Sequence, residues 1–186
     1  MPSPPEISLS ISIDPPTFTR GSVSPPSATI SITATSHASE PITIFTWHTI
    51  FNLPLAQRRK NFICTDLTTG LTLQLERTKG PKRQQFSYEL GGRDDEYFIT
   101  LEPEKPTIIT HRFLRSAGLE GDRVFKPGHR YQLKVCDNEE AEWWCYGRKE
   151  DVMSPPGQSS PKEGCEDPSG PPIRLSPIDP VEFEVE

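Results

Sequence analysis

The chain has 186 residues, which suits one domain with its own hydrophobic core and is short for two domains of ordinary size. Its 21 prolines and hydrophobic fraction of 33% favour short strands joined by loops over long helices. The formal net charge of −6 argues against a general nucleic-acid binder, because such proteins need a broadly basic surface. We therefore expect a single domain over residues 1–186.

Apolar and polar residues alternate along the chain with the period of two that is typical of half-buried strands. Denser apolar segments at 42–47, 61–66, 71–75, 97–101, 107–113 and 131–135 predict further strands, and helical periodicity is almost invisible. About eight to ten short strands with Gly and Pro turns predict an all-β fold, an antiparallel immunoglobulin-like β-sandwich. The alternating residues expected to face the core are Ile7, Leu9, Ile11, Ile13, Ile30, Ile32, Val181, Phe183 and Val185.

Residues 151–180 carry many prolines and no apolar periodicity before the last strand. Because proline cannot donate a hydrogen bond to a strand ladder, we expect a long, mobile connection here. A surface linker is the preferred interpretation, and a regulatory segment is the alternative.

A hairpin is predicted where "FICTD" and "LTLQL" flank a four-residue turn, with Asp66 opposite Leu71. The same register brings two basic runs together at the open end of the hairpin. Such a basic patch attracts an acidic or phosphorylated segment of a partner protein, and a solvated rim neutralised by the "RDDE" segment is the alternative. The patch consists of Arg58, Arg59, Lys60, Arg77, Lys79, Lys82 and Arg83.

The aromatic stretch "EWWCYG" at residues 142–147 raises the question of burial. A hairpin with the preceding strand would place Trp144 in the core and turn Trp143 outward, where it is only partly covered. The outward indole then packs under a loop or along the stem of Lys134, or it contacts a ligand or partner. A one-residue slip would exchange the two faces, so either face is open to burial. The same register sets Cys136 opposite Cys145, which permits a disulfide, although free thiols are expected inside the cell.

No catalytic or cofactor motif is visible in the sequence. The G-x-S-x-G, P-loop, G-x-G-x-x-G and H-E-x-x-H patterns are absent, and the four cysteines lack C-x-x-C spacing. We therefore expect no enzyme activity, no cofactor and no metal, with His37, His48, His111 and His129 as structural residues. The start of the chain shows no basic segment followed by an apolar run, which predicts a cytoplasmic protein without a membrane span.

A resemblance to a known family comes from "YFITLEPEKPTIITHRF" at 97–113 and "FKPGHRYQLKV" at 125–135. These segments resemble the non-catalytic immunoglobulin-like domain that precedes the protease domain of fungal peptidyl-lysine metalloendopeptidases. "WHTIFN", "CTDLTTG" and "WWCYG" look still more like a group of short uncharacterised proteins of filamentous fungi. The resemblance implies the fold and transfers no catalytic residue, because H-E-x-x-H is absent. The matching residues are Phe98, Thr100, Leu101, Pro103, Gly128, Tyr131 and Val135.

Together these patterns predict a non-enzymatic, intracellular β-sandwich that acts as a protein-interaction module. The alternative is a carbohydrate-binding β-sandwich that uses exposed aromatic residues, with Trp143 beside Trp47 or Tyr146 as a stacking platform. The oligomeric state is not predicted from the sequence.

Overall fold

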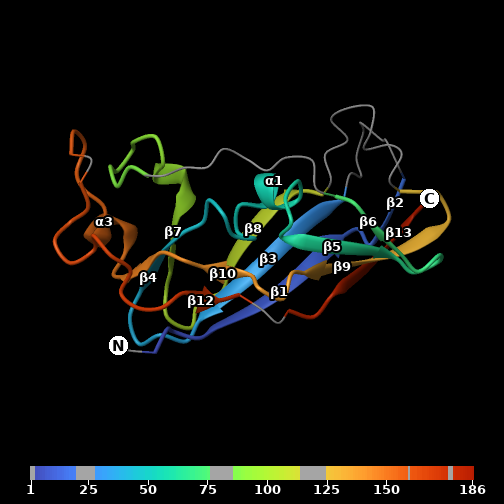
Figure 1. Ribbon diagram of the computed structural model, residues 1–186, viewed down its shortest axis with the longest axis horizontal. Helices are drawn as coiled ribbons and strands as arrows, with labels where there is room; N and C mark the ends of the chain where they lie inside the picture. The colour runs from blue at the N-terminus through green and yellow to red at the C-terminus, as the bar shows by residue number, and fades with distance from the viewer. Residues whose placement is uncertain (1–2, 20–27, 76–85, 114–124, 159, 176–177) are drawn as a thin grey trace.

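The computed structural model describes residues 3–19, 28–75, 86–113, 125–158, 160–175 and 178–186 (Figure 1). The fold is mostly β, built from several sheets that are largely antiparallel. The molecule is elongated, and the two ends of the chain lie toward opposite ends of its long axis. Within the described residues, helical structure is limited to single turns at α1 (Leu53–Ala56), η1 (Asp95–Tyr97) and α3 (Lys149–Val152).

One sheet has the strand order β1-β3-β8 and is antiparallel throughout. It consists of β1 (Ile7–Asp14), β3 (Thr29–Ser36) and β8 (Thr107–Arg112). The predicted alternation is confirmed here, because Ile30 and Ile32 are fully buried while the serines of β1 are exposed.

A second sheet has the order β2-β13-β9-β5-β6. Its strands are β2 (Thr17–Phe18), β13 (Val181–Val185), β9 (His129–Val135), β5 (Phe62–Asp66) and β6 (Leu71–Leu73), and only β2 and β13 pair in parallel. The predicted pairing of Asp66 with Leu71 is confirmed. The last strand also buries Phe183 and Val185 and exposes its glutamates, as its alternation predicts.

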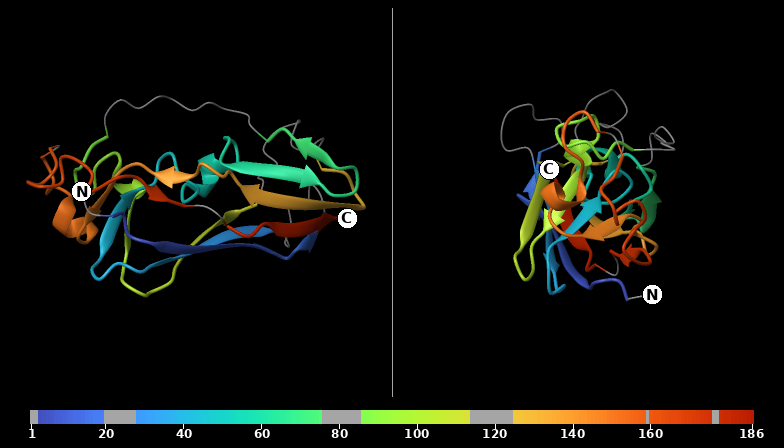
Figure 2. Two further views of the ribbon diagram at one scale, coloured as in Figure 1. Left: turned by 60° about the horizontal axis from the view of Figure 1, so that its bottom comes forward. Right: turned by 90° about the vertical axis from the view of Figure 1, so that its left-hand side faces the viewer.

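These two sheets run along the length of the molecule, and side chains of both belong to one hydrophobic core (Figure 2). Ile30 and Ile32 of one sheet belong to the same buried cluster as Tyr131, Leu133 and Phe183 of the other. Each fully buried side chain of this size contributes about 1.5–3 kcal/mol relative to exposure. This core therefore provides the main stabilisation of the fold.

Two smaller sheets form an end region on the side away from the C-terminus (Figure 1). One has the order β11-β4-β7, from Trp144–Tyr146, Ile42–Phe45 and Phe98–Leu101. The other pairs β10 (Glu140–Ala141) with β12 (Ile173–Arg174). The chain enters this region directly after β3 and again directly after β9.

The predicted hairpin between 131–135 and 142–147 is wrong. Strand β9 already pairs with β13 on one side and β5 on the other, so the chain that leaves β9 has no free edge to return to. Instead, β11 pairs with β4 in a different sheet. Cys136 and Cys145 are consequently not opposite each other, and all four cysteines are free thiols.

The two tryptophans of "EWWCYG" lie in two different hydrophobic clusters. Trp144 is fully buried in the main core, and its indole Nε1 donates a hydrogen bond of 2.9 Å to the Pro171 carbonyl oxygen. Trp143 belongs to a second cluster in the end region. The buried members of that cluster are Phe45, Trp47, Phe98, Trp143, Cys145, Val152, Met153 and Cys165.

The Pro-rich segment 151–180 contributes to the packing of the molecule. The expectation that it forms no strand ladder is wrong at β12, whose Ile173 is buried in the main core. Leu175 and Ile178 join the same core, and Cys165 joins the second cluster. The apolar residues are spaced irregularly, which is why periodicity did not reveal them.

Trp144→Ala should lower the free energy of unfolding by about 3–5 kcal/mol, because it leaves a large cavity in the main core and removes the hydrogen bond to Pro171. Urea denaturation followed by circular dichroism measures this change. The matched control is Leu71→Ala at a side chain that is 64% exposed, where a change of less than about 0.5 kcal/mol is expected. Equal effects of the two substitutions would contradict this assignment of the core.

Candidate functional site

The end region contains a pocket of about 390 Å³ between three separate parts of the chain. One wall comes from the end of β4 and the turn after it, another from the chain between β9 and β11, and a third from the segment before η1. A backbone hydrogen bond of 3.1 Å from Phe45 N to Trp143 O joins the first two parts. The lining residues are Phe45, His48, Thr49, Phe86, Asn138, Glu139, Glu140, Glu142 and Trp143.

Aromatic rings form the apolar side of the pocket. Phe45 and Phe86 stack with ring centroids 4.0 Å apart, and Trp143 meets Phe86 edge to face at 5.9 Å. Segment 86–90 is fixed in place by two backbone hydrogen bonds, Leu90 N to Ser154 O and Ser154 N to Tyr88 O. Backbone hydrogen bonds therefore hold the chain segments that carry Phe45, Phe86 and Trp143.

Trp143 is 6% exposed, so the expectation that it is only partly covered is wrong. Phe86 and Tyr88 pack against it, which matches the alternative in which the indole lies under a loop. Its Nε1 is buried and approaches the Tyr88 hydroxyl without an aligned hydrogen bond. Burial raises the pKa of Tyr88 to about 12 despite this contact, so the hydroxyl stays protonated.

Glu139 is a buried carboxylate that connects three chain segments. Its Oε1 accepts a hydrogen bond of 2.7 Å from Ile50 N, and both of its oxygens accept from Asn61 Nδ2, at 3.1 and 2.9 Å. Burial raises the pKa of Glu139 to about 7, although the hydrogen bonds from Asn61 and Ile50 act in the opposite direction. The negative charge of Glu140 raises it further.

Glu140 and Glu142 are exposed beside the buried Glu139, so three acidic side chains line the pocket. Among the described residues that line it, only His48 can carry a positive charge. Sequence reasoning missed this site. The acidic run "NEEAE" was visible, but its meeting with Phe45, His48 and Phe86 depends on the path of the chain after β9.

The predicted basic patch is described only in part. Arg58 and Lys60 are exposed, and they remain a prediction as a partner surface. Arg77, Lys79, Lys82 and Arg83 lie outside the described residues.

Arg59 is 8% exposed, so its expected place in an exposed patch is wrong. Its Nη1 donates a hydrogen bond of 2.7 Å to Trp47 O, and its guanidinium carbon lies 5.3 Å from the centre of the Trp47 ring. Burial and the charge of Arg58 lower the pKa of Arg59, and its Nε and Nη2 have no hydrogen-bond partner among the described residues.

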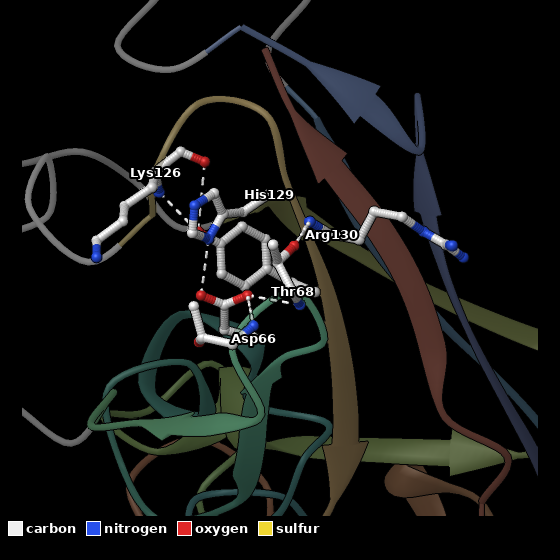
Figure 3. A network of polar contacts seen from close by, with 7 residues as sticks. Asp66, Thr68, Lys126, His129 and Arg130 are labelled. Atoms are coloured by element: carbon white, nitrogen blue, oxygen red, sulfur yellow. Dashed lines mark hydrogen bonds and ion pairs between the residues drawn. The ribbon is translucent and has the colours of Figure 1, made fainter.

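A polar network joins the β5 to β6 turn and the start of β9 (Figure 3), at the opposite end of the molecule from the pocket (Figure 1). Asp66 at the end of β5 accepts hydrogen bonds from His129 Nδ1 at 2.8 Å and from the backbone N–H groups of Thr68 and Thr69. Burial opposes its ionisation, but these hydrogen bonds outweigh burial and lower the pKa of Asp66 to about 2. They fix the β5 to β6 turn and the start of β9, which is a structural role.

Ser8, His37 and Glu104 form a hydrogen-bonded chain on the surface. Ser8 Oγ lies 2.6 Å from His37 Nε2, and His37 Nδ1 lies 2.9 Å from Glu104 Oε1. The order matches that of an acylating triad, but the side chains of His37 and Glu104 are 36% and 68% exposed. An acylating serine also needs hydrogen-bond donors directed at the developing oxyanion, so the order of these three side chains does not by itself define such a site.

Three of the four histidines lie in separate parts of the molecule. His37, His48 and His129 belong to the surface chain, the pocket and the opposite end of the molecule respectively. Within the described ranges, no group of three or more His, Cys, Asp or Glu residues is placed to hold a metal ion. In the same part of the chain, no helix is long and apolar enough to cross a membrane.

Comparison with protein-family models and with curated proteins finds no match for this chain. The resemblance to the non-catalytic domain of fungal metalloendopeptidases therefore stays a prediction.

In the wild type, the free energy of unfolding should fall as pH rises, and Glu139→Gln should remove this fall. The raised pKa means that folding favours the neutral carboxyl, so its contribution is fully present below about pH 4.5 and is lost as pH rises through about 7. The loss is on the order of 3 kcal/mol. Urea denaturation at several pH values should show this fall in the wild type and in the exposed control Glu142→Gln. An unchanged fall in Glu139→Gln would contradict the assignment.

Arg59→Glu should destabilise the fold by at least about 2 kcal/mol, because a buried carboxylate would replace the donor that faces the Trp47 carbonyl. Lys60→Glu makes the same charge change at an exposed neighbour and should alter stability by less than about 0.5 kcal/mol. Thermal unfolding of both variants measures the difference. Equal unfolding temperatures would show that Arg59 is exposed in solution.

Proposed function

We propose that the protein is a non-enzymatic immunoglobulin-like β-sandwich that binds a partner protein at the pocket of the end region. The observation that carries this proposal is the pocket itself, which lies between three parts of the chain and is lined by exposed carboxylates and fixed aromatic rings.

The order of strands supports the immunoglobulin-like part of the proposal. In that fold, strands A, B and E share one sheet while C, F and G share the other. Strands β1, β3 and β8 would correspond to A, B and E, and β5, β9 and β13 to C, F and G. Tyr131 near the start of β9 accepts a hydrogen bond of 2.6 Å from Lys126 N, like the tyrosine corner at the start of strand F.

The position of the pocket supports the binding part. The connection from β3 to β5 corresponds to the B–C loop, and the connection from β9 to β13 corresponds to the F–G loop. These two loops contribute to the antigen-binding end of antibody variable domains. The analogy is one of fold, and the pocket residues of this chain supply the specific chemistry.

A protein partner is favoured over a carbohydrate because the expected stacking platform is covered. Trp143 and Trp47 are both buried. Among the described residues, the exposed large hydrophobic side chains are Ile63, Leu67, Leu71 and Ile108, and none of them is aromatic. An intracellular location belongs to the proposal, and the four free thiols support it.

The test is affinity capture from a lysate of the source organism with three forms of the full chain. Wild type is compared with the pocket variant Glu140→Lys/Glu142→Lys and with the control Glu184→Lys/Glu186→Lys, which makes the same charge change at exposed residues of the C-terminal end. We expect a partner that wild type and control retain and that the pocket variant loses. Identical capture by all three folded forms would overturn the pocket as the binding site.

A further inference from the structure

We infer that the pocket of the end region receives the side chain of a lysine or arginine from the partner protein. This inference rests on the proposed function, because it names the chemistry of the segment that the pocket would bind. Charge, apolar lining and size each support it independently.

The charge of the pocket selects a cation. Glu139, Glu140 and Glu142 all line the cavity, and His48 is the only described lining residue that can be positive. Ammonium and guanidinium groups donate charge-assisted hydrogen bonds to carboxylates, which are stronger than hydrogen bonds between neutral groups. An acidic or phosphorylated segment would meet like charges here, so this site suits the opposite class of partner from the basic patch.

The apolar side of the pocket suits the stem of a basic side chain. Phe45 and Trp143 line it beside the carboxylates, and Phe86 is the partly exposed ring of the group. Lysine and arginine pack their methylene stems on apolar surface while the charged head reaches polar groups, and aromatic rings attract such cations. A pocket lined by both aromatic rings and carboxylates matches both halves of this side chain.

Size and spacing distinguish a basic side chain from a metal ion. A volume of about 390 Å³ lies near the lower end of ligand pockets and holds one side chain with part of its backbone. Among the described residues, no group of three or more His, Cys, Asp or Glu is placed to hold a metal ion. One guanidinium or ammonium group carries several N–H donors and can therefore bind more than one acceptor.

The experiment titrates the ¹⁵N-labelled full chain with three synthetic octapeptides of alternating glycine and lysine, glycine and glutamate, or glycine and glutamine. Chemical shifts of the amides of residues 138–143 and of the Trp143 indole N–H report on the pocket. We expect the lysine peptide alone to shift these signals in a saturable manner. Glu140→Lys/Glu142→Lys should weaken this binding at least about tenfold, and Glu184→Lys/Glu186→Lys, which has the same net charge, should retain it.

Three results would overturn the inference. Equal weakening in both double variants would show that the lysine peptide responds only to net charge. Stronger shifts at 138–143 with the glutamine or glutamate peptide would show a pocket that binds a different class of segment, which leaves the proposed function intact. No response of 138–143 to the lysine peptide would also reject a basic side chain, and the lysate capture would then decide the proposed function separately.

Discussion

The central constraint of this structure is that strand β9 has a neighbour on each side. Pairing with β5 and β13 satisfies the hydrogen-bonding groups along both of its edges, so the chain that leaves β9 at Cys136 must begin new structure elsewhere. It does so by pairing with β12 and then with β4, which creates the end region and its second hydrophobic cluster. Because the second sheet leaves no edge of β9 open, the residues after Cys136 pair elsewhere, and they form one wall of the pocket.

Glu139 lies between β9 and β10, where the chain passes from the second sheet into the end region. Its carboxylate accepts hydrogen bonds from Ile50 and Asn61, which both lie between β4 and β5, so this side chain joins the connection after β9 to the one after β4. A buried carboxylate is a costly way to satisfy two donors, since burial disfavours its charged form. The same group lines an acidic pocket, and a cation bound there would offset that cost. The proposed ligand would therefore stabilise the charged form of Glu139, which burial disfavours.

The sequence predicted the parts of the fold that depend on local pattern. Alternation located the faces of β1, β3 and β13, and turn chemistry set the pairing of Asp66 with Leu71. It also placed Trp143 and Trp144 on opposite faces, because adjacent strand residues always point apart. The predictions that failed required knowledge of which strand edges were free. The hairpin of Cys136 and Cys145, the exposure of Trp143 and the exposure of Arg59 all depended on neighbours that local pattern cannot identify.

The distribution of charge gives the candidate site its direction of selectivity. A chain with a net charge of −6 attracts positively charged molecules at long range. The acidic pocket would then bind most tightly those that place a cation against its carboxylates. Long-range attraction and local recognition therefore act with the same sign at the end region. At the exposed Arg58 and Lys60 the two effects oppose each other. These side chains would attract an acidic segment locally, but the net negative charge of the molecule repels it at long range. This difference is the physical reason to place a partner at the pocket before the basic patch.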